Sequence, residues 1–181
     1  RKDRSADGLR GIAAMSVVFH HALLAFFPSS MVAFIPWIVE PGTQPDPVGR
    51  FMSLPIISTV FNGRLAVCVF FVLSGYVLSR SFVLTGDSSR VRAQAMRRYV
   101  RLGIPVFASA IIAFAVFEAG AYFNEAAASI SKSMWLKIST PIGVSWVESI
   151  KQGLYGAIFQ SRASVNPVLR TMQIEFFGSM M

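Results

Sequence analysis

The stretch LRGIAAMSVVFHHALLAFF, residues 9–27, decides the fold. It is almost wholly apolar over a length that suits a membrane-spanning helix, which needs about 20 such residues. Three ionisable side chains interrupt it. Arg10 stands at its head, and His20 and His21 lie side by side about halfway along. Ionisable groups inside a membrane span are expensive, so these three are the first candidates for a functional role.

The composition of the whole chain also favours a membrane protein. Of its 181 residues 54% are hydrophobic and 14% are charged, and the mean hydropathy is +0.55, whereas a soluble domain carries about 25% charged residues. We therefore expect an all-α, polytopic integral membrane helical bundle. Its four membrane helices are predicted at residues 9–27, 56–79, 102–123 and 168–181, and the last is expected to be incomplete, so the chain is interpreted as truncated.

Several residues between and inside these spans carry further expectations. The second span is interrupted by Asn62-Gly63-Arg64, and Cys68 within it is predicted to be a buried, inert thiol. Pro105 is placed in the first turn of the third span, where its missing N–H matters little. Residues 124–166 are predicted to form an outer loop with one or two interfacial helices, with Trp135 and Trp146 at the depth of the membrane–water interface.

The basic residues predict how the chain is oriented in the membrane. Ten of the 17 Lys and Arg residues lie in two clusters, four before the first apolar run and six between the second and third, and the connector between them has few charges. This alternation follows the positive-inside rule, so the N-terminus and the 80–101 loop are predicted to be cytoplasmic and no nucleic-acid partner is expected. The ten residues are Arg1, Lys2, Arg4, Arg10, Arg80, Arg90, Arg92, Arg97, Arg98 and Arg101.

The spacing of Arg10 and His21 separates the two histidines. Eleven positions come to about three helical turns, so Arg10 and His21 share one face about 16 Å apart along the axis. His20 is offset by about 100° and is predicted to be structural. One interpretation is a polar channel in which Arg10 meets an anionic ligand and His21 acts as a general base. A membrane anchor for Arg10 and a structural hydrogen bond for His21 are the alternatives.

Four ordered motifs resemble a known family. DGLRGIAAMSVVFHH resembles the first helix of the acyltransferase 3 family of multi-pass membrane acyltransferases, in which an arginine, ten residues and a histidine follow one another. GRLAVCVFFVLSGYVLSRSF resembles its second helix, RRYVRLGIP the entry to its third, and NPVLRTMQIEFFGSMM a later motif that ends on a glutamate. In that motif Thr171 and Glu175 fit, whereas Arg170 stands where the family has a tryptophan.

The resemblance implies that residues 1–181 are the N-terminal part of a single membrane acyltransferase domain. It implies transfer of an acyl group, commonly acetyl, from acyl-CoA to a hydroxyl of a carbohydrate or lipid-linked acceptor, without a metal. The implied site residues are His21 as general base, Glu175 orienting His21 or binding the acceptor, Arg10, Arg98 and Arg101 for the polyanionic acyl donor, and Ser74 for helix packing or lining the channel.

Two other interpretations stay open on the sequence alone. Intramembrane Arg, His and Glu also build the proton relays of transporters, so a transporter-like or non-catalytic membrane protein is one. An inactive truncated remnant of the enzyme is the other, and Arg170 favours it.

Overall fold

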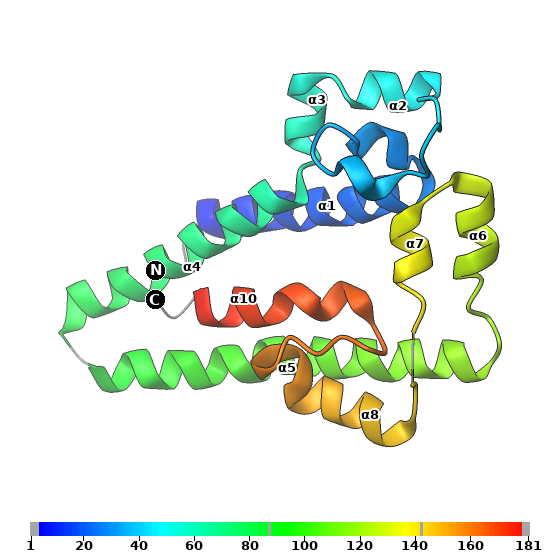
Figure 1. The fold of residues 1–181 in the computed structure, drawn as a ribbon. Helices are drawn as coiled ribbons and strands as arrows, with labels where there is room; N and C mark the ends of the chain where they lie inside the picture. The colour runs from blue at the N-terminus through cyan, green and yellow to red at the C-terminus, as the bar shows by residue number, and fades with distance from the viewer. Residues whose placement is uncertain (1–3, 87, 142, 179–181) are drawn as a thin grey trace. The chain divides into compact units, whose positions relative to one another are not determined.

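The part of the chain that the structure describes is built from helices. The computed structural model describes residues 4–86, 88–141 and 143–178, with side chains for all of these except 4, 77–82, 84–85, 88–92, 94–95 and 178. These residues form no strand, and they include an isolated antiparallel bridge between Val39 and Ser133. The elements (Figure 1) are α1 (Arg4–Phe26), η1 (Pro28–Met31), η2 (Pro36–Ile38), α2 (Pro47–Met52), α3 (Pro55–Val60), α4 (Gly63–Thr85), α5 (Ser88–Glu118), α6 (Asn124–Ser131), α7 (Met134–Ile138), α8 (Trp146–Lys151), the π-helical turn η3 (Gln152–Gly156), α9 (Ala157–Phe159), η4 (Pro167–Thr171) and α10 (Met172–Gly178).

The chain divides into two compact units, and each is described by itself. The first unit comprises Arg1–Val69 and Phe123–Thr140, and the second comprises Phe70–Tyr122 and Pro141–Met181. The first therefore holds α1 to α3 with α6 and α7, and the second holds α5 with α8 to α10. Helix α4 begins in the first unit and continues into the second.

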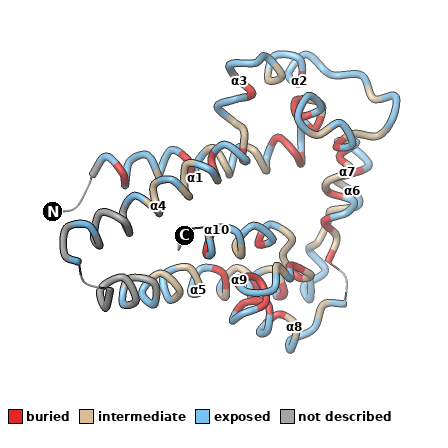
Figure 2. The backbone as a smooth tube through the Cα atoms, turned by 60° about the vertical axis from the view of Figure 1, so that its left-hand side comes forward, coloured by how far each residue is buried: buried red, intermediate tan, exposed pale blue. Residues whose placement is uncertain are grey.

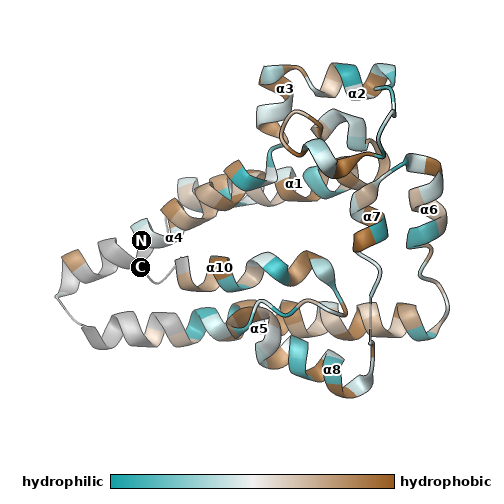
Figure 3. Cartoon of the chain, in the orientation of Figure 1, coloured by the Kyte–Doolittle hydropathy of each residue, from teal (hydrophilic) through white to brown (hydrophobic). Residues whose placement is uncertain are grey.

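Two helices are long and apolar enough to cross a membrane. They are Ser5–Phe26 within α1 and Met96–Glu118 within α5, and only 22% and 17% of their apolar windows is buried, unlike the core helix of a soluble protein. Figure 2 shows the described parts of both helices largely exposed, and Figure 3 shows hydrophobic residues along the second half of α5. The expected count of four spans is not confirmed. Among the described residues the apolar part of α4, Gly63–Tyr76, is shorter, and α10 has 7 residues.

The second expected span, residues 56–79, is divided into two helices. Helix α3 ends at Val60 and α4 begins at Gly63. The Oδ1 atom of Asn62 accepts a hydrogen bond from the backbone N–H of Arg64 at 3.0 Å. Asn62 therefore satisfies an N-terminal donor of α4 and starts a new helix, as a capping residue does.

Two side chains of α1 form hydrogen bonds with the backbone at this break between α3 and α4. The hydroxyl of Ser16 donates to the carbonyl of Val60 at 2.6 Å, and Nδ1 of His20 lies 3.1 Å from the carbonyl oxygen of Phe61. A Cβ atom at Gly63 would lie 2.6 Å from Cδ2 of His20, so only glycine fits beside this ring. His20 thus takes the structural position that its offset face predicts.

The third expected span, residues 102–123, is shifted in the structure. Helix α5 begins at Ser88 and ends at Glu118, so part of the expected 80–101 loop is helical. Pro105 consequently lies inside the helix and not in its first turn, where its missing N–H cannot pair with the carbonyl of Arg101. The side chains of Arg80, Arg90 and Arg92 lie outside the described residues.

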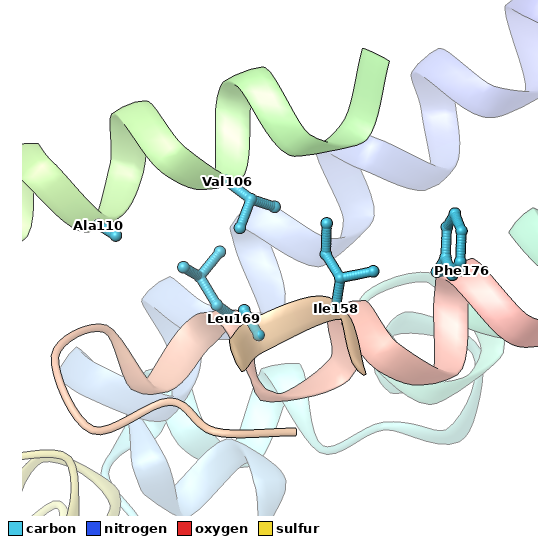
Figure 4. Close-up of a cluster of buried hydrophobic side chains, with 6 residues drawn as sticks. Val106, Ala110, Ile158, Leu169 and Phe176 are labelled. Carbon is cyan, nitrogen blue, oxygen red and sulfur yellow. The ribbon is translucent and has the colours of Figure 1, made fainter. Parts of the chain in front are cut away.

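The core of the second unit forms where α5 meets α9, η4 and α10. Val106 and Ala110 of α5 face Ile158, Leu169 and Phe176, and all five are buried (Figure 4). This packing holds α10 along α5 and so places the C-terminal motif.

In the first unit, α7 packs against the C-terminal end of α1. The carbonyl of Leu24 has no donor four residues later, because residue 28 is proline. The fully buried hydroxyl of Ser133 donates to it at 2.6 Å. Leu136 packs with Ala25 in the same region. The expected outer loop therefore contains several short helices, and one of them is fixed to the first predicted span.

Candidate functional site

His21 lies on α1 with one ring nitrogen engaged. Its Nδ1 atom is 2.9 Å from the carbonyl oxygen of Val17, one turn earlier on the same helix. A carbonyl can only accept, so Nδ1 carries the hydrogen, and in the neutral ring Nε2 then holds the free lone pair. This is the tautomer that a general base acting through Nε2 requires. The imidazole is half-buried.

The indole of Trp135 on α7 packs against the imidazole of His21. The ring centroids of His21 and Trp135 are 5.6 Å apart, and the ring planes meet at 69°, an edge-to-face contact. His20 is the other aromatic neighbour, with its centroid 5.8 Å from that of His21. The indole packs partly buried against two hydrophobic clusters of the first unit.

Arg10 lies on the same helix as His21. Helix α1 is continuous from Arg4 to Phe26, as the shared face requires. Nη1 of Arg10 lies 3.5 Å from Oδ1 of Asp7, one turn earlier, and both side chains are partly exposed. A surface pair of this kind contributes little to stability.

Arg98 joins α5 to α4 within the second unit. Its Nη2 donates to the backbone carbonyl of Ser74 at 3.1 Å. Arg101 lies one turn further along α5, and its side chain is exposed. Arg98 therefore has a helix-joining contact that the sequence did not predict, and Arg101 stands where an anion can reach it.

Glu175 is half-buried on α10, beside the core residue Phe176. Within the described residues its carboxylate has no hydrogen-bond or ion-pair partner. Thr171 and Arg170, which precede it in the motif, are both exposed at the end of η4. The backbone carbonyl of Arg170 accepts a hydrogen bond from the hydroxyl of Ser161 at 3.0 Å.

The structure brings some of the expected site residues together. Arg10 and His21 share α1 in the first unit, and Arg98 meets Ser74 in the second. Glu175 belongs to the second unit, so its predicted action on His21 is a relation between units and stays a prediction. The carbonyl of Val17 already occupies Nδ1, the atom that an orienting carboxylate would take.

The sequence pattern does not indicate that α7 packs beside His21. Trp135 is predicted only to be an interfacial aromatic, and Ser133 has no predicted role. One signal was present, because Pro28 follows the first span and leaves its last carbonyls without donors. Nothing in the sequence indicates which distant hydroxyl supplies the missing donor.

Helix α7 also carries one member of a charged pair, Lys137, whose partner Glu40 lies in the connector that follows α1. Nζ of Lys137 donates to the carboxylate of Glu40. This hydrogen bond, together with the positive charge of Lys137, lowers the pKa of Glu40 below its ordinary value. The pair therefore links α7 to the connector that follows α1.

Cys68 and the His, Asp and Glu side chains are the candidates for thiol chemistry and metal binding. In the described part of the chain no three His, Cys, Asp or Glu side chains gather as a metal site would need. Cys68 is exposed on α4, so the expectation of a buried thiol is wrong.

The fold and the site define a helical protein with two helices of membrane-spanning length and a histidine base candidate on the first of them. Residues 3–158 match the acyltransferase 3 family, which is described as an acyltransferase domain. The chain therefore belongs to this family of acyltransferase domains. No solved structure gives a significant match.

Curated relatives agree with this assignment. The chain is 36% identical over 106 residues to O-acetyltransferase PaAT-1 from Phomopsis amygdali, covering 55% of this chain and 19% of that protein. It is 32% identical over 81 residues to acyltransferase clz18 from Cochliobolus lunatus, covering 38% and 17%. It is 27% identical over 142 residues to acyltransferase R4 from a Phoma species, covering 63% and 29%. The chain thus corresponds to less than a third of the length of each relative.

Proposed function

We propose that the protein carrying this chain is a membrane-bound O-acyltransferase that moves an acyl group, acetyl in the first instance, from acyl-CoA to a hydroxyl of a carbohydrate or lipid-linked acceptor. The observation that carries the proposal is the bond from Nδ1 of His21 to the carbonyl of Val17, which leaves Nε2 with the free lone pair that a general base needs. Membership of the acyltransferase family supports the class of reaction, and the printed name of one relative supports O-acetyl transfer.

The proposed chemistry needs only one proton carrier. Nε2 of His21 takes the proton of the acceptor hydroxyl while the oxygen attacks the thioester carbonyl. The tetrahedral intermediate then collapses, the C–S bond breaks, and the thiolate of CoA leaves. The imidazolium returns the proton to that thiolate, so His21 ends the cycle neutral. A hydroxyl is a poor nucleophile until a base removes its proton, which is why the base is the central element.

The remaining site residues bind the two substrates in this proposal. Arg10 on α1 and Arg98 and Arg101 on α5 attract the phosphates of CoA, because guanidinium groups bind phosphate in a two-pronged geometry. Ser74 holds Arg98 through its carbonyl. Glu175 binds the acceptor hydroxyl, a role that suits a carboxylate without another partner among the described residues.

The proposal includes a multi-pass arrangement in the lipid bilayer. Its N-terminus and residues 80–101 lie on the cytoplasmic side, where the positive-inside rule places them. That side also holds the basic residues that would receive acyl-CoA. The transporter-like alternative has no supporting observation of its own, since the family match concerns an acyltransferase domain.

A donor-binding experiment tests this assignment. The complete protein is expressed in membranes and supplied with radiolabelled acetyl-CoA, and label transfer to membrane acceptors is measured. Arg101→Ala should raise the KM for acetyl-CoA about tenfold, because one charge-assisted phosphate contact is lost. Lys151→Ala, an exposed cation on α8, is the matched control and should leave this KM unchanged. Absence of transfer by the wild-type protein would overturn the proposal.

A further inference from the structure

The contact between His21 and Trp135 has no counterpart in the family motifs that the sequence shows. Those motifs lie on α1, α4, α5 and the segment of η4 and α10, whereas Trp135 comes from the short helix α7, between the third and fourth expected spans. The two rings nevertheless meet edge to face at a centroid distance of 5.6 Å. The contact therefore ties the base candidate to a segment far from it in sequence.

Helix α7 is held against α1 on both sides of Trp135. On one side, the hydroxyl of Ser133 donates to the carbonyl of Leu24, which lies one turn beyond His21. On the other side, Leu136 is buried against Ala25 of α1. Trp135 thus extends toward His21 from a backbone that is fixed before and after it.

Trp135 differs from the other tryptophans of the chain. Trp37 and Trp146 are 56% and 60% exposed, as expected for side chains at a membrane–water interface. Trp135 is partly buried and packs against both hydrophobic clusters of the first unit. Its surroundings are those of a packing residue, so the interfacial role predicted from the sequence does not describe it.

An imidazole on a helix needs two restraints to present one nitrogen reliably. The bond from Nδ1 to Val17 fixes which nitrogen carries the hydrogen. It leaves the ring free to swing out on its side-chain torsions whenever that bond opens. An indole packed against the imidazole restrains that movement, because the edge-to-face contact would have to break for the ring to swing out.

We propose that Trp135 is a positioning residue that holds the imidazole of His21 with Nε2 presented to the acceptor hydroxyl. This rests on the proposed function, because it assigns the base a supporting residue. Trp135 acts through His21 and touches no reacting atom in this account. Trp135 affects the orientation of the base. Its loss should therefore lower kcat and leave binding of the acyl donor unchanged.

The test compares three substitutions in the complete, membrane-embedded protein with radiolabelled acetyl-CoA. Trp135→Ala should lower kcat up to about 100-fold, the scale of an ångström-sized misplacement of a catalytic group, with the KM for acetyl-CoA unchanged. Trp135→Phe should restore most of the rate, because it keeps an aromatic wall. Trp135→Leu fills space without a ring and should stay slow. Trp37→Ala removes an exposed tryptophan of the same unit and should match the wild type.

A spectroscopic measurement separates positioning from mere stability. NMR of isotope-labelled histidine should show the Nδ1–H tautomer of His21 in the wild type and in Trp135→Phe, and a mixture of tautomers in Trp135→Leu. If Trp135→Leu keeps the wild-type kcat and tautomer, the inference is wrong, and this holds even where Trp135→Ala does not fold. If His21→Ala is also fully active, the proposed function fails instead, so the two failures are distinguishable.

Discussion

Two adjacent histidines on α1 have different partners. His20 bonds to the carbonyl of Phe61 and packs on Gly63, whereas His21 bonds within its own helix to Val17. Their side chains are about 100° apart around the helix axis. His20 therefore contacts the break between α3 and α4, whereas His21 contacts α7. Sequence spacing predicts this division, because Arg10 and His21 share a face that His20 does not.

Gly63 provides a test of the His20 contact. Gly63→Ala should destabilise the protein by about 1–3 kcal/mol, since the new Cβ would lie 2.6 Å from the His20 ring and overpacking of this kind is destabilising. Heat denaturation of the purified protein in detergent measures the effect.

A matched control exists on α1. A Cβ at Gly11 would meet no heavy atom within 4 Å, so Gly11→Ala should leave stability equal or higher. In the His20→Ala background the loss caused by Gly63→Ala should shrink, because the colliding ring is gone. An undiminished loss in that background would show that the ring is not the obstacle.

At the scale of elements, the packing of α7 on α1 depends on a proline. Pro28 ends α1 and leaves the carbonyl of Leu24 without its usual donor, and Ser133 supplies one. The same hydroxyl accepts from the backbone N–H of Leu136 at 3.4 Å, so it also caps α7. One buried side chain therefore joins two helices.

Removing that hydroxyl should loosen the pair. Ser133→Ala should lower the free energy of unfolding by about 1–3 kcal/mol, because a buried carbonyl is left unpaired. Ser129→Ala, at an exposed position of α6, is the control and should be nearly neutral, since its hydroxyl bonds only within its own helix. Chemical denaturation in detergent checks both. Equal stability of the two variants would contradict the bridging role of Ser133.

The Glu40–Lys137 pair predicts a pH dependence of this same helix packing. The pKa of Glu40 is lowered by its hydrogen bond to Lys137 and by that residue's charge, so the pair stabilises the folded state fully above the ordinary glutamate pKa of about 4.5. The contribution is lost as the pH falls through the lowered pKa.

Glu40→Gln should therefore be less heat-stable than the wild type near neutral pH and equal to it in acid. The side chains are partly exposed, so the difference should be small and should decrease with salt. Lys137→Gln should give the same pattern. A stability gap that is identical at neutral and acid pH would rule out the pair as its cause.

Some element boundaries follow from the sequence and others do not. The sequence indicates the interruption at Asn62-Gly63-Arg64 within the predicted span 56–79, but apolar length alone does not show that α3 and α4 are separate helices there. Trp135 could not be matched to His21, because a contact between segments distant in sequence leaves no periodic pattern. The start of α5 at Ser88 was missed because a basic stretch forms a helix as readily as a loop, whatever its charge.

At the scale of the whole molecule, the basic clusters predict the orientation of the chain in the membrane. A reporter that is active only in the cytoplasm should be active when inserted after Gly86 and inactive when inserted after Gly143. The first position lies between α4 and α5, and the second lies beyond the α5 span. The reverse pattern would contradict the proposed topology.

Substitution of His21 is the most direct test of its assignment as the general base. In the complete protein in native-like membranes, transfer of label from radiolabelled acetyl-CoA should fall to background in His21→Ala. His20→Ala, matched in size and position, should keep transfer per folded molecule and lose only stability, since His20 bonds to Phe61. Unchanged transfer by His21→Ala, or an equal loss in both variants, would contradict the assignment of His21 as the general base.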